Sequence, residues 1–414
     1  MMTEILCLGL ALAAAQDPGT PELRGGWLAA DTFDTAQHRT DIVAKFRRGH
    51  LNTVFLTIPP LNGNYGSADP SAFGALITEA QAAGLSVHAW FQNFKRQGEA
   101  VPADFTSSAE REAQKQWVLA ILAAYPALDG VHLDYIRYST WEASNAAKIS
   151  GVAETVHTIR ETLKAQHPGK PLTAAVFNAA AVSYRGWKPA WEGDVPQWYR
   201  DWYASDPNNY YVQKANEPGN DPNWMLGPSY TSYQQDPPAW LKADYLDAVC
   251  SMQYTSVDAT WQNEAKLWKS FLTFQGVGVD RAMIGLGWMA PVQYFEDSNF
   301  DAPALVRFIK YGRSLGLKGF SIFRLGQPGV DDSVLLDALS IDGPSNGNAA
   351  PFQLDVASTL GSAPPPPPLV PPPGGTGTPS PRSGKGNGCG LTGWEVLLFL
   401  WIGRIGRAKS GRPS

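Results

Sequence analysis

Two side chains with acid–base chemistry, His132 and Asp134, lie two residues apart in the apolar segment 129–135. If this segment is a β-strand, its side chains alternate between two faces, so both point the same way and Asp134 stands at the strand's end. A carboxylate at the end of a buried strand costs solvation free energy and gains no packing, so we interpret Asp134 as functional. The alternative is a structural aspartate that pairs with Arg137 or with a backbone amide.

The segment 85–91 repeats this arrangement. The same alternation places His88, Trp90 and Gln92 on one face of a strand. An imidazole, an indole and a carboxamide that point toward one site suit a polyhydroxylated ligand better than an apolar one. The alternative for His88 is a histidine packed in the core.

Eight short apolar runs alternate with amphipathic stretches from residue 25 onward. This alternation is typical of repeated βα units, and eight units in series favour a closed (β/α)8 barrel over an open sheet. We therefore expect an α/β protein with one barrel domain over residues 22–342. The runs are 26–30, 53–58, 85–91, 130–134, 172–177, 248–253, 283–287 and 320–323.

Capping signals mark the helices between these runs. Asp69 precedes a proline, which predicts an N-cap followed by a proline in the first turn, and Gly84 stands where a helix would end. Ser107 and Glu110 have the spacing of a capping box, in which each side chain accepts a hydrogen bond from the other residue's N–H.

The fifth and sixth strands are much further apart than the others, and the excess, residues 182–236, contains 12 Trp and Tyr residues. In a barrel this insertion opens on the face where active sites are assembled. Its rings, such as Trp187, Trp191, Trp198 and Trp202, could be stacking platforms for sugars. The alternative is that the insertion uses its aromatic residues as a small core of its own.

The formal charge of −5 is distributed unevenly. Residues 344–414 carry six basic and two acidic side chains, a charge of +4, which leaves −9 on residues 1–343. A body this acidic argues against binding to nucleic acid.

Of the three cysteines only Cys250 falls in the expected domain, so no internal disulfide is expected there. The apolar residues around Cys250 in the sequence predict that it lies in the core.

Residues 1–15 contain an apolar run followed by small residues, as in a secretory signal peptide. No Lys or Arg precedes the run, which leaves a misplaced start codon or a short buried segment as alternatives. We expect an exported, monomeric bacterial protein, either extracellular or anchored at the cell surface.

The C-terminal region is too rich in Pro and Gly to bury a core, so we expect a disordered tail. Residues 343–388 form a linker, and residues 389–414 contain Cys389, the apolar run 396–402 and then basic residues. This order resembles bacterial C-terminal sorting signals, and membrane contact is expected only through this segment. A weak anchor without processing is the alternative.

The sequences of 24–28, 85–91, 128–138 and 246–254 together resemble the bacterial glycosyl-hydrolase-like family 10, whose members are barrel hydrolases of envelope polysaccharides. The resemblance covers about residues 24–325 and implies that Asp134 is the catalytic aspartate and His132 its partner on the strand. The chain has Gln92 and Asn93 where the family tends to have Asn-Pro, and Tyr135 where the family has a second acidic residue, so the number of catalytic carboxylates stays open.

Glycoside hydrolysis usually requires two carboxyl groups. We favour Glu296 as the partner of Asp134, because it follows the seventh strand on a loop that should overhang the barrel. The other candidates are Asp31, Asp34, Glu192 and Asp194.

No cofactor is expected. The pair His132 and Asp134 has no third metal ligand in a recognisable motif, which disfavours a metal-dependent deacetylase, and no phosphate-binding loop is present. The expected function is hydrolysis of a polysaccharide or oligosaccharide, and the competing hypothesis is a non-catalytic carbohydrate-binding barrel of the cell envelope. The side chains expected to contact the ligand are His88, Trp90, Gln92, His132, Arg137, Asn178, Gln253, Tyr254 and Trp288.

Overall fold

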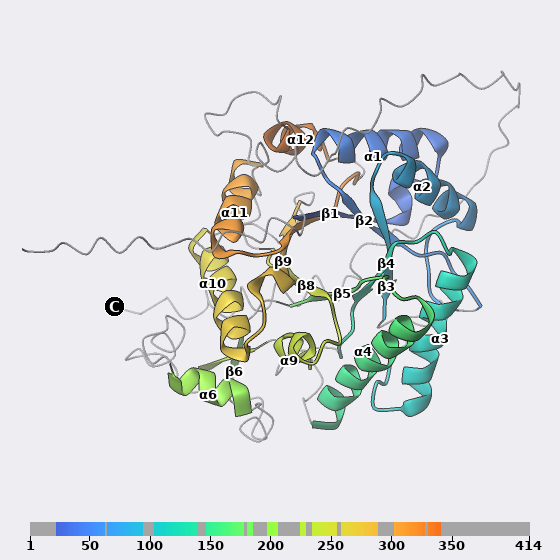
Figure 1. Ribbon diagram of the computed structural model, residues 1–414. Helices are drawn as coiled ribbons and strands as arrows, with labels where there is room; N and C mark the ends of the chain where they lie inside the picture. Colours follow the sequence, from blue (N-terminus) through green and yellow to red (C-terminus); the bar gives the residue numbers. More distant parts are fainter. Residues whose placement is uncertain are drawn as a thin grey trace, which may run out of the picture.

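The computed structural model describes residues 22–62, 64–93, 103–138, 146–177, 180–184, 197–205, 224–228, 234–254, 258–288, 302–327 and 330–340. Eight parallel strands form a closed barrel in the order β1-β10-β9-β8-β5-β4-β3-β2 (Figure 1). The predicted (β/α)8 barrel is therefore confirmed. The strands are β1 (Leu23–Leu28), β2 (Thr53–Thr57), β3 (Ser86–Gln92), β4 (Gly130–Asp134), β5 (Leu172–Val176), β8 (Ala248–Met252), β9 (Ala282–Gly287) and β10 (Gly319–Phe323).

Helices surround the strands on the outside of the barrel (Figure 1). The ring of helices closes where α12 packs between α11 and α1. Two short 3-10 helices, η1 (Ala30–Thr32) and η3 (Val279–Arg281), lie after β1 and before β9. The helices are α1 (Ala36–Arg48), α2 (Pro70–Ala82), α3 (Ser108–Ala124), α4 (Ala146–Gln166), α9 (Pro237–Lys242), α10 (Asp258–Gln275), α11 (Ala302–Leu315) and α12 (Ser333–Leu339).

The predicted signals at the ends of α2 are confirmed. The carboxylate of Asp69 accepts hydrogen bonds from the N–H groups of Ser71 and Ala72 at 3.0 and 2.9 Å. Gly84 follows the helix with φ of +80°, a conformation that costs glycine little because it has no Cβ.

Only one half of the predicted capping box at α3 has the expected form. The Ser107 hydroxyl accepts a hydrogen bond from the N–H of Glu110 at 3.4 Å. The N–H of Ser107, however, donates to the carbonyl oxygen of Asp104, while the carboxylate of Glu110 accepts from Gln114 Nε2 at 2.8 Å. The prediction of this second half was wrong, because Glu110 binds Gln114, one helical turn away, instead of the N–H of Ser107.

Strand side chains alternate between two cores, as the sequence predicts. Val131 and Leu133 of β4 belong to the large core between the barrel and the helices. The inward side chains fill the barrel interior, which is packed like any core. Gly130 leaves room for a neighbour, because a Cβ there would lie 2.8 Å from the ring of His88. The buried apolar residues of the interior are Trp27, Phe55, Trp90, Ala175, Ala248, Cys250 and Met283.

The insertion between β5 and β8 contains regular structure in its described parts. β6 (Ala180–Tyr184) and β7 (Trp224–Pro228) form an antiparallel pair, and α6 (Gln197–Ser205) lies between them in the sequence. α9 then leads back to the barrel and contacts both α4 and α10.

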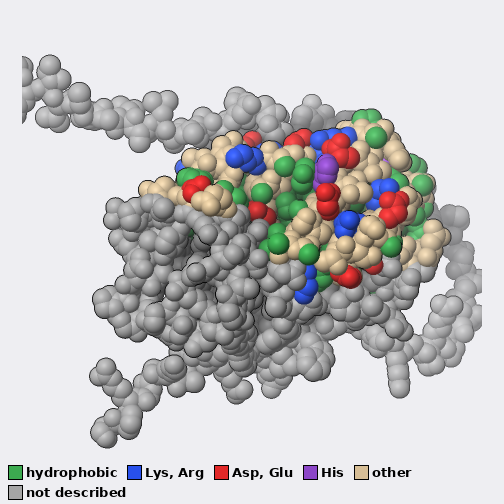
Figure 2. Space-filling view, turned by 90° about the horizontal axis from the view of Figure 1, so that it is seen from below, with side chains coloured by type: hydrophobic (Ala, Val, Ile, Leu, Met, Phe, Trp, Pro, Cys, Tyr) green, Lys and Arg blue, Asp and Glu red, His purple; other side chains and the backbone are tan. Residues whose placement is uncertain are grey.

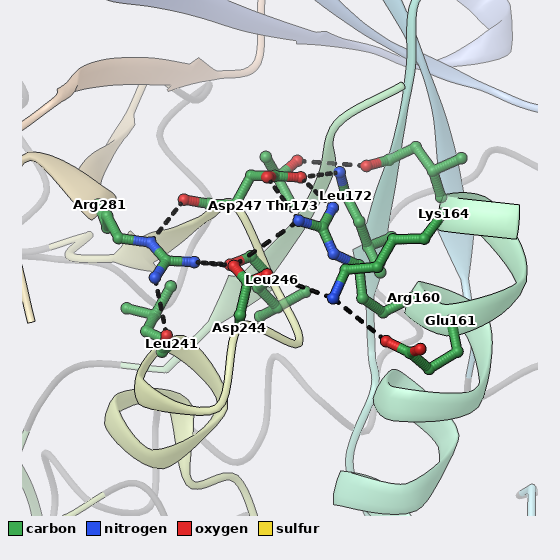
Figure 3. Close-up of polar contacts among 11 residues, drawn as sticks. Arg160, Glu161, Lys164, Leu172, Thr173, Leu241, Asp244, Leu246, Asp247 and Arg281 are labelled. Carbon is green, nitrogen blue, oxygen red and sulfur yellow. Dashed lines mark hydrogen bonds and ion pairs between the residues drawn. The ribbon is translucent and has the colours of Figure 1, made fainter. Parts of the chain in front are cut away.

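A cluster of charged side chains joins the starts of β5 and β8 (Figure 3). Because the barrel strands are parallel, this end of the barrel is opposite to the one with Asp134, the last residue of β4. Asp244 pairs with Lys164 at 3.2 Å and with Arg281 at 3.2 Å. Arg281 also donates to the carbonyl oxygen of Leu241 at 2.8 Å. These contacts link α4, the end of α9 and η3, so they hold together the two barrel strands that the insertion separates in the sequence.

The face drawn in Figure 2 has a mixed surface. Lys and Arg side chains alternate there with Asp and Glu, and hydrophobic side chains are scattered among them in the described part. Among the described helices, none is both long enough and apolar enough to cross a membrane.

Candidate active site

Asp134 is the last residue of β4 and stands at the carboxyl end of the barrel, as predicted. It is buried, with 6% of its surface exposed. Its Oδ2 accepts a hydrogen bond from the indole N–H of Trp90 at 3.0 Å. Its carbonyl oxygen accepts from the N–H of Asn93 at 2.8 Å, which ties the ends of β3 and β4 together. The carboxylate is therefore held by neighbouring strands at the face where barrel enzymes place their chemistry.

The backbone turns sharply immediately after this carboxylate. Tyr135 has φ of +53°, a left-handed conformation that is uncommon for a bulky residue. The turn brings the N–H of Tyr135 within 2.7 Å of Asp134 Oδ1. Non-glycine residues in this conformation concentrate at functional sites, where the surrounding structure supports the strain.

Arg137 lies beside the carboxylate. Its Nη1 is 3.9 Å from Asp134 Oδ1, which is an ion pair but too long for a hydrogen bond. The guanidinium carbon lies 4.3 Å from the ring centre of Tyr135 and 4.6 Å from that of Phe177. Two aromatic rings thus hold the guanidinium of Arg137 close to Asp134. The ion pair between Asp134 and Arg137, which was the structural alternative to a chemical role for Asp134, is therefore present.

Trp90 and Gln92 point into the barrel from β3, but they differ in accessibility. Trp90 is only 4% exposed, and its indole N–H is bound to Asp134, so its position suits support of the carboxylate more than contact with a ligand. Gln92 is half-buried and lies opposite Asp134 in the strand register. Of these two predicted ligand contacts, Gln92 has the more open position.

His88 and His132 are packed in the barrel interior. His132 is fully buried, its Nδ1 lies 2.8 Å from the hydroxyl oxygen of Thr173, and its ring stacks on Phe55 at 4.1 Å. His88 packs edge-on against the same phenylalanine. Burial lowers the pKa of His88 from 6.5 to about 4. It also lowers the pKa of His132 well below 6.5, with an added contribution from His88. Both are therefore neutral core histidines beneath the site, a position that does not suit direct contact with a ligand.

The end of β8 adds polar groups to the mouth of the barrel. Gln253 is buried, and its Oε1 accepts no hydrogen bond within the described residues. The ring of Tyr254 stacks on Phe323 at the end of β10, at 5.6 Å and 19°. Burial raises the pKa of Tyr254 well above 10, and the negative charge of Asp134 acts in the same direction, so its hydroxyl keeps its proton. Phe323 was not predicted, although the alternation of residues in the last strand would have placed it in the interior.

Trp288 occupies a different place from the one expected. Its indole N–H donates to Asp332 Oδ1 at 3.0 Å, and the ring belongs to the core outside the barrel. Asp332 also accepts from the N–H of Gly326 and pairs with Lys45. We correct the prediction of ligand contact here, because the strand's alternation continues through Trp288 and turns its side chain toward α12.

Two of the carboxylates considered as a second catalytic group lie in the described residues. Asp31 pairs with Arg324 through two contacts of 3.1 and 3.2 Å, so it joins the ends of β1 and β10. Asp34 is exposed and lies 2.5 Å from His38 on α1. The remaining predicted residues, Glu296, Glu192, Asp194 and Asn178, lie outside the described residues.

Two of the four tryptophans proposed as sugar platforms are anchored on the outside of the barrel. Trp202 is 2% exposed, packs against Phe271 of α10 and donates to the hydroxyl of Ser270 at 2.8 Å. Trp198 packs on the same ring. At these positions the structure supports a packing role for the rings, but in the large core between the barrel and its helices and not in a separate core of the insertion. Trp187 and Trp191 lie outside the described residues.

Within the described residues, no group of three or more His, Cys, Asp or Glu side chains is arranged to hold a metal ion. Of the described ionisable side chains, Arg137 lies beside Asp134, and Tyr254 is close enough for the charge of Asp134 to raise its pKa.

No protein-family model and no curated protein matches the sequence. Among solved structures, a chitinase from Rhizomucor miehei is 16% identical, with a TM-score of 0.47, over 76% of this chain and 98% of its own. A chitinase from Chromobacterium violaceum is 12% identical, with a TM-score of 0.49, over 78% of this chain and 98% of its own. The spore cortex-lytic enzyme SleL of Bacillus megaterium is 9% identical, with a TM-score of 0.47, over 78% of this chain and 74% of its own. At this level of likeness we draw no functional conclusion from the three structures.

Proposed function

We propose that this protein is a glycoside hydrolase that acts on a polysaccharide, with Asp134 as a catalytic carboxylate. The observation that carries the proposal is the position of Asp134, buried at the carboxyl end of β4 and bound by the indole N–H of Trp90. Burying a carboxylate is costly, and here it gains no packing in the core, so a chemical role accounts for it best.

Half-buried and buried polar groups beside Asp134 would bind the sugar hydroxyls. Gln92 lies opposite Asp134, Gln253 has a buried acceptor without a partner in the described residues, and Tyr254 keeps its hydroxyl proton. Arg137 is a fixed cation at the same place. Together they supply both donors and acceptors, as a polyhydroxylated ligand requires. We also include Asn178, which follows β5.

Glycoside hydrolysis needs a second group to complete the chemistry. We propose Glu296 for this role, because it follows β9 in the sequence and loops after barrel strands overhang the mouth. In the pair, one carboxyl group donates a proton to the leaving oxygen, and the other stabilises or attacks the sugar carbon or activates water.

The second candidate function is a carbohydrate-binding barrel without turnover. It is favoured by the pairing of Asp31 with Arg324, because a carboxylate neutralised by two contacts to a guanidinium is a poor proton donor. If Glu296 also does not reach the mouth of the barrel, Asp134 would have no second catalytic carboxylate, and the site could bind a sugar without cleaving it.

Incubation with a panel of bacterial and plant polysaccharides distinguishes the two functions. The proposal predicts that new reducing ends appear with at least one polysaccharide, and that they do not appear with heat-denatured protein. Binding in a pull-down with the same insoluble polysaccharides, without any reducing ends, would establish the binding protein instead.

We further propose that residues 1–15 direct export and that the basic C-terminal segment, residues 389–414, holds the protein at the cell surface. The apolar runs at the two ends and the Pro- and Gly-rich linker before the second run support this. Detection of the protein in the cell-wall fraction, and its release into the medium after deletion of residues 389–414, tests the proposal.

A further inference from the structure

Both oxygens of Asp134 face hydrogen-bond donors. Trp90 Nε1 lies 3.0 Å from Oδ2, and the N–H of Tyr135 lies 2.7 Å from Oδ1. Arg137 Nη1 lies 3.9 Å from Oδ1 and adds a positive charge. Of these three groups, Trp90 is the one that comes from another strand.

None of these three groups can accept a hydrogen bond. An indole nitrogen, a backbone N–H and a guanidinium nitrogen are donors only. These contacts place positive or partly positive groups against both carboxylate oxygens, and none of the three can accept the proton of a carboxylic acid. Each of them is therefore stronger with the ionised carboxylate than with the protonated form, so they favour ionisation of Asp134.

We propose that Trp90 is a positioning residue whose indole N–H holds Asp134 ionised and in one orientation, so that Asp134 is the anionic member of the catalytic pair and not the proton donor. Its catalytic consequence rests on the proposed function. In the reaction the glycosidic C–O bond breaks, its electron pair stays on the leaving oxygen, and that oxygen takes a proton from the second acid. The charge of Asp134 faces the positive charge that develops on the sugar ring. The oxygen of a water molecule then forms the new bond to that carbon, and the proton that the water loses returns to the catalytic pair.

The barrel interior contains a matched control for this contact. Trp27 on β1 is buried like Trp90, and its ring also packs edge-on against Phe323. Its indole N–H, however, is buried and has no hydrogen-bond partner among the residues that the structure describes. Trp90→Phe and Trp27→Phe therefore remove the same atoms from the same core, but only the first removes a hydrogen bond to Asp134.

The first test measures Asp134 itself and needs no substrate. In protein labelled with 13C at the aspartate carboxyl groups, Asp134→Asn identifies the Asp134 signal by its loss. Trp90→Phe should raise the titration midpoint of this signal by about one pH unit, and Trp27→Phe should leave it within about 0.3 units of wild type. Thermal melting shows that each variant is folded. An unchanged midpoint in folded Trp90→Phe, or an equal rise in both variants, would overturn the proposal.

The second test measures catalysis on a polysaccharide that the wild type cleaves. Trp90→Phe should lower kcat at least about tenfold with little change in KM, and the acidic limb of the pH profile should move to higher pH. Trp27→Phe should keep the wild-type profile. A shifted carboxyl signal with an unchanged kcat would refute the catalytic half. If the wild type cleaves no polysaccharide, the proposed function fails, while the titration still decides whether Trp90 holds Asp134 ionised.

Discussion

Arg160 of α4 and Asp247, the residue before β8, form a two-point ion pair with contacts of 2.6 and 2.9 Å. The same carboxylate accepts a hydrogen bond from the N–H of Leu172 at 2.7 Å. One aspartate thus joins a helix and the starts of two strands, β5 and β8, which are neighbours in the barrel but are separated by the insertion in the sequence (Figure 3).

Removal of this ion pair should destabilise the barrel. We expect Arg160→Met to lower the free energy of unfolding by about 1–3 kcal/mol, because Arg160 is mostly buried and Asp247 would lose two charged hydrogen bonds. Urea unfolding measures the change. Arg307→Met is the matched control, since Arg307 and its partner Asp258 are 51% and 45% exposed and should contribute less than about 1 kcal/mol. Equal losses in the two variants would contradict the structural role of Asp247.

The buried histidines should make the protein sensitive to acid. The pKa of His88 is about 4 in the folded state, below the usual 6.5, so the unfolded chain binds more protons between these values. Stability is therefore complete above pH 6.5 and is lost as the pH falls toward 4, and His132 adds to the effect in the same direction. Between pH 7.5 and 5, His88 should account for about 2 kcal/mol of lost stability.

The test compares urea unfolding of wild type and His88→Gln at both pH values. The variant should lose less stability on acidification, whatever its stability at pH 7.5. His38→Gln, at an exposed position, is the control for the substitution itself. Parallel pH dependence of wild type and His88→Gln would show that His88 is not buried in its neutral form.

Asp236 should affect the stability of the protein in the opposite direction to His88, with a contribution that declines as the pH rises. It caps α9, and burial raises its pKa from 3.8 to about 6, against the effect of hydrogen bonds from Ala239 and Trp198. The folded state holds this proton more tightly than the unfolded state, so its contribution to stability declines as the pH rises from 3.8 through 6. Asp236→Asn keeps a capping side chain without the charge, and it should be about 1–3 kcal/mol more stable than wild type at pH 8. In urea unfolding at pH 4.5 this gain should fall to about a third of its value at pH 8; a gain of the same size at both values would refute the account.

Some tryptophans of the insertion should contribute to stability, and others should contribute to the binding of saccharides. Trp202→Ala should cost about 3–5 kcal/mol of stability, because the ring is buried against Phe271, and it should leave saccharide binding unchanged. Trp187→Ala should instead weaken long oligosaccharides more than short ones, as expected for a sugar platform. Calorimetric titration with oligosaccharides of increasing length measures the second effect. Equal loss of binding in both variants, with both folded, would contradict this division.

The sequence allowed the barrel strands to be predicted because a parallel barrel buries both faces of every strand, which leaves apolar runs at regular intervals. Alternation along β4 also placed Asp134 correctly, since it depends only on neighbouring residues. The Trp90–Asp134 hydrogen bond joins residues 44 positions apart, and no local pattern encodes such a contact. The position of Trp288 was predicted wrongly for the same reason, because its partner Asp332 is also 44 positions away in the sequence.

The two histidines illustrate a second limit. Alternation correctly turned His88 and His132 toward the barrel interior, but it does not show how deep in the interior a side chain lies. In the register Gln92 lies opposite Asp134 at the mouth, whereas His88 lies opposite Gly130 at the other end of β4. Depth depends on the stagger of all eight strands, which a single strand's sequence does not reveal.

The most direct test of the central claim is the turnover of Asp134→Asn on a polysaccharide that the wild type cleaves. The amide has nearly the same shape as the carboxylate but cannot ionise, so the variant should fold, bind the polysaccharide and release reducing ends at least about a hundredfold more slowly. A folded Asp134→Asn protein with wild-type turnover would contradict the account, because the site described here would then have no part in the reaction.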